Sequence, residues 1–137
     1  MAKVSSILES SLYVADLKRS SEFYRDLFEF SIMACDDRFC ALAAGERQVL
    51  LLFRKGACGD ASPTPGGTIP GHDGTGALHI AFAIDPSDRE EWEKRLQAKR
   101  IAIESRVTWP RGGQSIYFRD PDRHLVELAT PGVWPIY

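Results

Sequence analysis

The feature that most constrains the fold is an internal repeat that relates the first half of the chain to the second. At an offset of 70 residues, the apolar positions of 8–14 fall on those of 78–84, and at an offset of 69 those of 23–32 fall on those of 92–101. Self-similarity of this kind indicates a duplicated structural unit. Whatever fold the first half adopts, we therefore expect the second half to adopt it too.

The first half predicts the order strand, helix and three strands. Residues 8–14 alternate apolar and polar side chains, and Asp16 follows as a candidate helix cap. Apolar residues then recur at helical spacing: Phe23, Tyr24, Leu27 and Phe28. Three short apolar runs, separated by turn-prone residues, complete the unit at 31–34, 39–43 and 48–53.

The second half repeats this order with one extra break. Residues 78–84 predict a strand, and Ser87 with Glu90 forms a candidate capping box for the helix that follows. Further extended runs lie at 101–104, 106–109, 115–119 and 125–129. The pattern predicts an α+β fold made of two βαβββ modules in tandem, with module one at about 6–55 and module two at 77–131 of a single domain spanning 1–137.

A glycine-rich segment separates the modules. Residues 56–76 hold seven of the eleven glycines of the chain, and we expect no regular element there. The segment is typical of a linker or of a mobile lid. His72 lies within it, where it either covers a bound substrate or is a solvated loop histidine.

Composition excludes several classes of function. The 137 residues carry a formal net charge of -2 without a basic block, which argues against a nucleic-acid partner. No run of apolar residues is long enough for a membrane span or an export signal, so we expect a cytoplasmic protein. The three cysteines, Cys35, Cys40 and Cys58, fit no metal-binding spacing, and we expect reduced thiols.

Strand alternation gathers chemically active side chains on one face of each module. Glu9, Ser11 and Tyr13 share the face that points away from the predicted helix of the first module. In the second module His79 lies among alanines, and Tyr117 and Glu127 can line the same hollow. The repeat superposes Glu9 on His79 and Leu51 on Glu127. Two carboxylates and an imidazole indicate a metal site.

The chain resembles the vicinal oxygen chelate superfamily, which contains glyoxalases, bleomycin resistance proteins and extradiol dioxygenases. The resemblance lies in "LYVADLKRSSEFYRDLFEF" at 12–30, "LHIAFAI" at 78–84 and "SIYFRDPDRHLVELATP" at 115–131. It implies a curved mixed sheet around a cup-shaped cavity, one divalent metal per site held by Glu9, His79 and Glu127, and a homodimer.

The sequence departs from the family at several positions. Glu9 stands where many relatives have histidine, and Leu51 stands where glyoxalase I-like members supply a fourth ligand. The chain also lacks the tail arginine of fosfomycin-modifying members, so the resemblance implies no direct role in fosfomycin modification. Tyr117 matches the tyrosine that extradiol-like members use beside their iron.

An incomplete set of protein ligands leaves room for a substrate on the metal. The expected function is a metal-dependent enzyme of lyase, isomerase or dioxygenase type that acts on an oxygen-bearing small molecule, with Mn²⁺, Fe²⁺, Ni²⁺ or Zn²⁺ as the metal. Glu9 or Glu127 would act as a base, Tyr117 would assist Glu127 in catalysis, and three side chains would hold the substrate: Ser11, Tyr13 and Trp109.

Each of these residues also has a structural interpretation. His79 can be a core histidine bonded to backbone, Glu9 a surface glutamate, and Glu127 the partner of Arg119 or Arg123 in a salt bridge. His124 has the parity of core residues and is not expected to bind metal. The alternative function is a metal-free protein that sequesters an aromatic ligand, with four side chains as stacking surfaces: Tyr13, Phe53, Trp109 and Trp134.

Overall fold

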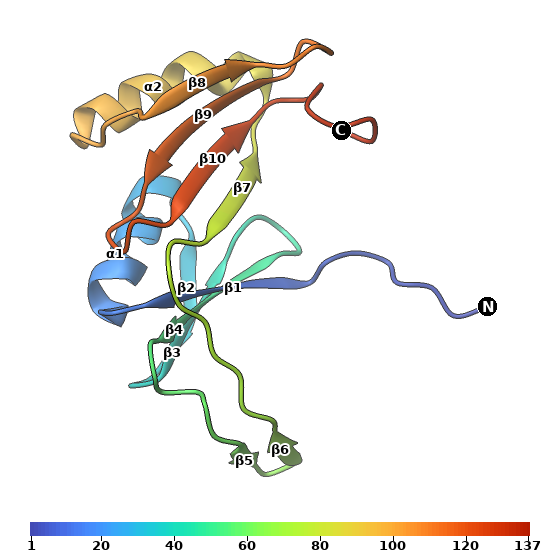
Figure 1. The fold of residues 1–137 in the computed structure, drawn as a ribbon, viewed down its shortest axis with the longest axis vertical. Helices are drawn as coiled ribbons and strands as arrows, with labels where there is room; N and C mark the ends of the chain where they lie inside the picture. The colour runs from blue at the N-terminus through green and yellow to red at the C-terminus, as the bar shows by residue number, and fades with distance from the viewer. The chain divides into compact units, whose positions relative to one another are not determined.

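The computed structural model describes residues 1–137, which form two compact units, Met1–Thr75 and Gly76–Tyr137. Each unit contains a four-stranded mixed sheet, and both follow the order strand, helix and three strands (Figure 1). The α+β class and the duplicated βαβββ order expected from the repeat are confirmed. None of the helices combines the length and apolar character that crossing a membrane requires.

The sheet of the first unit has the strand order β1-β4-β3-β2, in which β1 and β4 run parallel and the other neighbours are antiparallel. Its main elements are β1 (Glu9–Val14), α1 (Leu17–Phe28), β2 (Ser31–Cys35), β3 (Phe39–Ala43) and β4 (Val49–Arg54). The crossover from β1 through α1 leads to β2 at the far edge, and the chain then returns by hairpins, so β4 ends beside β1.

Local sequence explains where α1 begins and which face it buries. The carboxylate of Asp16 accepts the backbone N–H of Arg19 at 3.0 Å, as the sequence predicts for a helix cap. Tyr24 and Leu27 are buried on the inner face of the helix. Leu12 and Leu52 are buried on the sheet. The alternating pattern of β1 therefore places Leu12 in the core and leaves Glu9, Ser11 and Tyr13 on the opposite face.

The prediction of no regular element in 56–76 was wrong. A short hairpin forms there from β5 (Ser62–Thr64) and β6 (Gly67–Ile69). The glycines permit close packing, because a Cβ at Gly74 would collide with the ring of Tyr13 and a Cβ at Gly71 would collide with the backbone at Gly59. Residues 56–75 of the segment are thus a packed part of the first unit.

The second unit has the equivalent strand order β7-β10-β9-β8. Its elements are β7 (His79–Ala83), a 3-10 turn η1 (Pro86–Asp88), α2 (Arg89–Ala98), β8 (Ser105–Thr108), β9 (Gln114–Arg119) and β10 (Leu125–Ala129). The run at 101–104 forms no strand. The capping box expected from Ser87 and Glu90 is also absent, because the carboxylate of Asp85 accepts the Ser87 N–H and begins the 3-10 turn instead.

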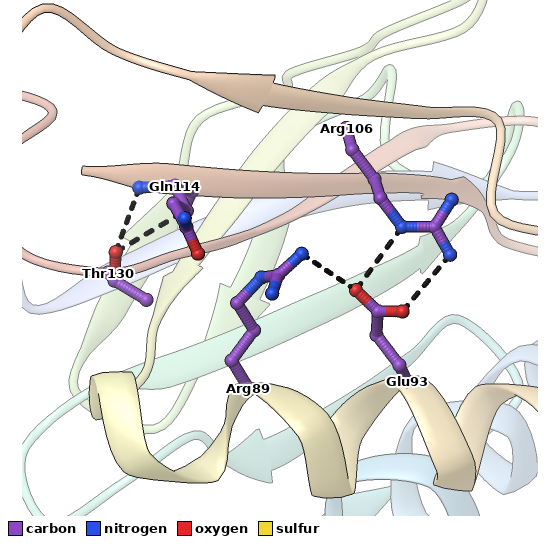
Figure 2. A network of polar contacts seen from close by, with 5 residues as sticks. All are labelled: Arg89, Glu93, Arg106, Gln114 and Thr130. Atoms are coloured by element: carbon purple, nitrogen blue, oxygen red, sulfur yellow. Dashed lines mark hydrogen bonds and ion pairs between the residues drawn. The ribbon is translucent and has the colours of Figure 1, made fainter. Parts of the chain in front are cut away.

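Ion pairs attach α2 to the edge strand β8. Glu93 lies between Arg89 and Arg106, with its carboxylate 2.9 Å from the first guanidinium and 3.1 Å from the second (Figure 2). Hydrogen bonding to Arg106 is the main cause that holds the pKa of Glu93 below its usual value. Figure 2 also shows Thr130 beside Gln114, and the Thr130 hydroxyl accepts the Gln114 N–H at 2.9 Å.

The strand registers place the two units in residue-by-residue correspondence. In the first unit Glu9 pairs with Val49 and Ser11 pairs with Leu51. In the second unit His79 pairs with Leu125, and Glu127 lies two residues further along its strand than Leu125. Glu9 and His79 therefore occupy the same position of the repeat. By the same register, Leu51 is the counterpart of Glu127.

The expectation of three reduced thiols was wrong for two of them. Cys35 and Cys40 face each other across the antiparallel pair of β2 and β3 and form a disulfide, while Cys58 is free and buried. The two bonded cysteines bracket a tight turn, a separation the spacing rules for metal sites and frameworks do not cover.

We expect alkylation of the unfolded, unreduced protein to label one thiol and alkylation after reduction to label three. Closing so short a loop removes little chain entropy, so reduction should lower the free energy of unfolding by about 2 kcal/mol. Mass spectrometry counts the labels, and urea denaturation with and without reductant gives the energy. Three labels without reductant would show that the bond does not form.

Candidate functional site

His79 and Glu127 meet on the exposed face of the second sheet. His79 begins β7, Glu127 lies in the middle of β10, and the His79 Nε2 is 3.3 Å from the Glu127 Oε2. The imidazole is half exposed, with 50% of its side-chain surface accessible, whereas the carboxylate is 8% accessible. The neighbouring Ala81 and Ala83 leave the imidazole uncovered, as the strand alternation predicts.

A backbone hydrogen bond fixes the tautomer of His79. Its Nδ1 lies 2.9 Å from the carbonyl oxygen of Leu125, and a carbonyl can only accept, so Nδ1 carries the hydrogen. In the neutral ring, the Nε2 lone pair then faces the carboxylate of Glu127. Two electron-rich atoms at this distance need a cation between them, either a proton or a metal ion.

Three further side chains extend the contacts of Glu127. The hydroxyls of Ser115 and Tyr117 donate to its Oε1 at 2.5 and 3.1 Å. The indole N–H of Trp109 donates to the Ser115 oxygen at 2.8 Å. Burial, followed by the bond to Glu127, raises the pKa of Tyr117, so its hydroxyl stays protonated at neutral pH and serves as a donor.

Sequence reasoning singled out Tyr117 and Trp109 but missed Ser115. The signal was present, because Ser115 lies two residues before Tyr117 on the same strand and so shares its face. A serine gives no motif by itself, and its role becomes visible only when the register sets it opposite Ala129, beside Glu127.

The structure agrees with some of the structural interpretations given in the sequence analysis and disagrees with others. Glu127 makes no salt bridge with Arg119, which pairs with Glu104 at 2.7 Å. His79 does bond to backbone, yet only through Nδ1, which leaves Nε2 to face the Glu127 carboxylate. His124 is a core residue, with 0% of its surface exposed, and its Nδ1 accepts the Leu78 N–H at 2.9 Å.

The first unit presents the other predicted residues around a cavity of about 760 Å³. Glu9, Ser11 and Tyr13 line it from β1, and Leu51 lines it from β4. Another cavity, of about 590 Å³, lies beside α2 in the second unit, and none of the predicted site residues lines it. Within either unit by itself, no three His, Cys, Asp or Glu side chains gather closely enough to hold a metal ion.

The glycine-rich segment adds His72 to the cavity of the first unit. The Tyr13 hydroxyl lies 2.7 Å from the His72 Nδ1, and the imidazole packs edge-on against Phe53 with ring centroids 4.4 Å apart. His72 is half-buried, so the interpretation as a solvated loop histidine was wrong. Gly71 and Gly74, which pack closely against Gly59 and Tyr13, allow the segment to bring this ring against β1 and β4.

A Tyr117→Phe variant tests the contacts around Glu127. If Glu127 binds a divalent metal, as the sequence predicts, this variant should lower the metal affinity by about 10-fold, because the partners that orient a metal-binding carboxylate typically contribute 10- to 100-fold. The hydroxyl is removed while the ring is kept, so thermal stability should change little. Calorimetric titration with Zn²⁺ or Ni²⁺ gives the affinity. Unchanged affinity would exclude an orienting role for this hydroxyl.

Comparison with known proteins identifies a family and a set of relatives. The sequence profile described as "Glyoxalase/Bleomycin resistance protein/Dioxygenase superfamily" matches residues 5–128. The metallothiol transferase FosB of Staphylococcus saprophyticus is 30% identical over 129 residues, which cover 93% of this chain and 78% of the transferase. The fosfomycin resistance protein FosX of Mesorhizobium japonicum is 40% identical over 55 residues, 38% of each chain.

Among solved structures, the lactoylglutathione lyase of Agrobacterium tumefaciens is similar with a TM-score of 0.88. The two sequences are 32% identical, and the match covers 98% of this chain and 99% of the lyase. This similarity supports the fold class that the internal repeat predicts.

Proposed function

The chain belongs to the glyoxalase, bleomycin resistance protein and dioxygenase superfamily, and on that premise we propose that it is a divalent-metal-dependent enzyme acting on an oxygen-bearing small molecule. The observation that carries the proposal is the contact between the His79 Nε2 and the Glu127 Oε2 at 3.3 Å. A separation of this size suits two donors that share one ion through bonds of about 2.0–2.2 Å.

Glu9 is the proposed third metal ligand. It begins β1 as His79 begins β7, and the registers give the two residues the same position in the repeat. Its side chain is exposed and lines the cavity of the first unit. Two carboxylates and one imidazole suit Mn²⁺, Fe²⁺, Ni²⁺ or Zn²⁺, and the donor set by itself does not choose among these ions.

The metal supplies Lewis acidity at an oxygen of the substrate when it is bound. The residues of the chain set the conditions for this chemistry. Ser115 and Tyr117 donate to one oxygen of Glu127, which keeps the other oxygen turned toward His79. Glu9 is the freer carboxylate and is the stronger candidate to take a proton from the substrate.

The remaining predicted residues fall into two roles. Ser11 and Tyr13 line the cavity beside Glu9 and are proposed to contact the substrate. Trp109 was predicted to hold substrate, and its indole N–H is committed to Ser115. We therefore propose that Trp109 positions Ser115 and contacts the substrate only through its ring.

The names of the relatives support a preference among the reaction types. The similar proteins are named a metallothiol transferase and a lactoylglutathione lyase; the first name refers to a thiol and the second to a thioester of the thiol glutathione. We therefore favour a lyase or thiol-transfer reaction over the dioxygenase type. A homodimer accompanies this proposal as an expectation from the family resemblance, and a cytoplasmic location as an expectation from the composition of the chain.

Activity assays with a panel of substrates test the proposal. The metal-reconstituted protein is assayed against dicarbonyl and epoxide substrates with glutathione or cysteine as the thiol, with catechols and O₂ as the dioxygenase arm. We expect turnover of the dicarbonyl or epoxide substrates in the presence of a thiol. A chelator should abolish this turnover, and added metal should restore it. Fosfomycin with a thiol is included, and no turnover is expected there because the tail lacks the arginine of the fosfomycin-modifying members.

A metal-free binding protein is the second candidate, and one observation favours it. Tyr13 stacks on Phe53 with ring centroids 5.8 Å apart, and both rings line the cavity of the first unit. Such a wall can hold an aromatic ligand without any metal. Ligand binding that is tight and insensitive to chelator, together with no turnover in any arm of the panel, would favour this function over the first.

A further inference from the structure

The guanidinium of Arg38 carries a positive charge at the cavity of the first unit and makes no ion pair with a carboxylate, although the backbone N–H of Arg38 donates to the Asp36 carboxylate at 2.7 Å. It lies immediately before β3 and lines the cavity together with Cys58 and Ser62. Its Nε donates to the Ala57 carbonyl at 3.3 Å, one terminal nitrogen donates to the Ser62 oxygen at 2.7 Å, and the other is 3.8 Å from the Cys58 sulfur. Each of these partners is uncharged or weakly polar, so the guanidinium charge is not neutralised by an ion pair.

The contacts leave part of the guanidinium available. Of its five N–H groups, three are directed at the three partners, which leaves one N–H on each terminal nitrogen. The bonds to Ala57 and Ser62 come from the glycine-rich segment and hold the planar group in place before any ligand arrives. A guanidinium positioned in advance loses less side-chain entropy on binding an oxyanion than a free one does.

The rest of the cavity limits what such an oxyanion can belong to. Tyr13, Phe53 and His72 form an aromatic wall, and a volume of about 760 Å³ is in the range of small-molecule pockets. Three carboxylates also line the cavity: Glu9, Asp36 and Asp60. These negative charges disfavour a ligand with several anionic groups, such as a nucleotide with a chain of phosphates.

We propose that Arg38 anchors the single oxyanion of a small substrate whose apolar body lies against Tyr13 and Phe53. The oxyanion is a carboxylate or a phosphonate, since the guanidinium recognises both. The assignment of this molecule as the substrate rests on the proposed function, because Glu9 lines the same cavity. The binding of the anion by Arg38 does not depend on a metal.

The test is a titration of the full-length protein with benzoate, phenylphosphonate and neutral benzamide. NMR spectra of the backbone amides detect binding at each step of the titration. We expect both anions to bind the native chain and Arg38→Met to weaken them by about 10- to 100-fold, as for the loss of a charged hydrogen bond. Benzamide, which has the shape of benzoate without its charge, should bind equally to both. The more tightly bound of the two anions identifies the oxyanion class, and inorganic phosphate should bind more weakly than either because it has no apolar body to lie against Tyr13 and Phe53.

Arg54→Met is the matched control. Arg54 ends β4 in the same sheet, and its Nε also donates to a backbone carbonyl, that of Asp37 at 2.8 Å, but it does not line the cavity. We expect it to bind both anions as the native chain does. A change below about threefold in Arg38→Met, or no saturable binding of either anion to the native chain, would overturn the proposal.

Performing each titration with and without bound metal separates this proposal from the previous one. Anion binding that requires Arg38 in a protein that takes up no metal would support the Arg38 site and contradict the metalloenzyme. Metal uptake without Arg38-dependent anion binding would support the metalloenzyme and contradict the Arg38 site.

Discussion

The His79→Ala variant is expected to bind divalent metal more than about 100-fold more weakly than the native chain, since residues that only orient a ligand already contribute 10- to 100-fold. The Nε2 of His79 is the only imidazole nitrogen that faces Glu127, at 3.3 Å, and its removal leaves the carboxylate of Glu127 without its nitrogen partner. Glu127→Gln should have a similar effect, because the amide keeps the shape but loses the charge. Competition with a chromophoric chelator measures both affinities.

Two variants of the same residue types serve as controls for this prediction. His72→Ala removes an imidazole that bonds to Tyr13, and Glu104→Gln removes a carboxylate that bonds to Arg119. Neither residue is a proposed ligand, so both variants should keep the native metal affinity. If the His79→Ala variant keeps the native affinity for divalent metal, the His79 imidazole is not a metal ligand.

The His124→Ala variant is expected to lower the free energy of unfolding by about 3 kcal/mol, through a cavity and a buried N–H without its acceptor. His124 is 0% exposed and accepts the backbone N–H of Leu78, the residue that precedes His79. Its backbone N–H in turn donates to the Asp120 carboxylate at 2.8 Å. Urea denaturation of the metal-free protein measures the loss without a contribution from bound metal.

His72→Ala provides the comparison here as well. Its ring is half-buried and makes one hydrogen bond to Tyr13, so its loss should cost about 1 kcal/mol. Equal costs for the two variants would contradict the assignment of His124 to the core and of His72 to the wall of a cavity.

The repeat made most of the fold predictable from the sequence. Each half had to follow one order of elements, and alternation on β1 and β10 then separated Leu12 and Val126 from Glu9 and Glu127. Both apolar residues are buried as the alternation requires. The parity of His124 with Val126 likewise placed it in the core.

The errors arose where local composition gave no information on contacts between distant residues. The seven glycines in 56–76 predicted a segment without regular structure. Two of them, Gly71 and Gly74, are instead needed because a side chain there would collide with the backbone at Gly59 or with the ring of Tyr13. The disulfide depended on the register of β2 and β3, which places Cys35 opposite Cys40. The sequence did not predict a role for Arg38, because a single arginine forms no motif and its partners come from a later segment.

The central claim is that the chain holds one divalent ion through His79 and Glu127. Elemental analysis of protein purified without a metal-binding tag, and again after reconstitution with Mn²⁺, Fe²⁺, Ni²⁺ or Zn²⁺, tests this claim most directly. We expect about one ion per chain for at least one of these metals in the native protein, and none in the His79→Ala and Glu127→Gln variants. A native protein that retains none of the four ions would contradict the claim and would favour the metal-free binding function.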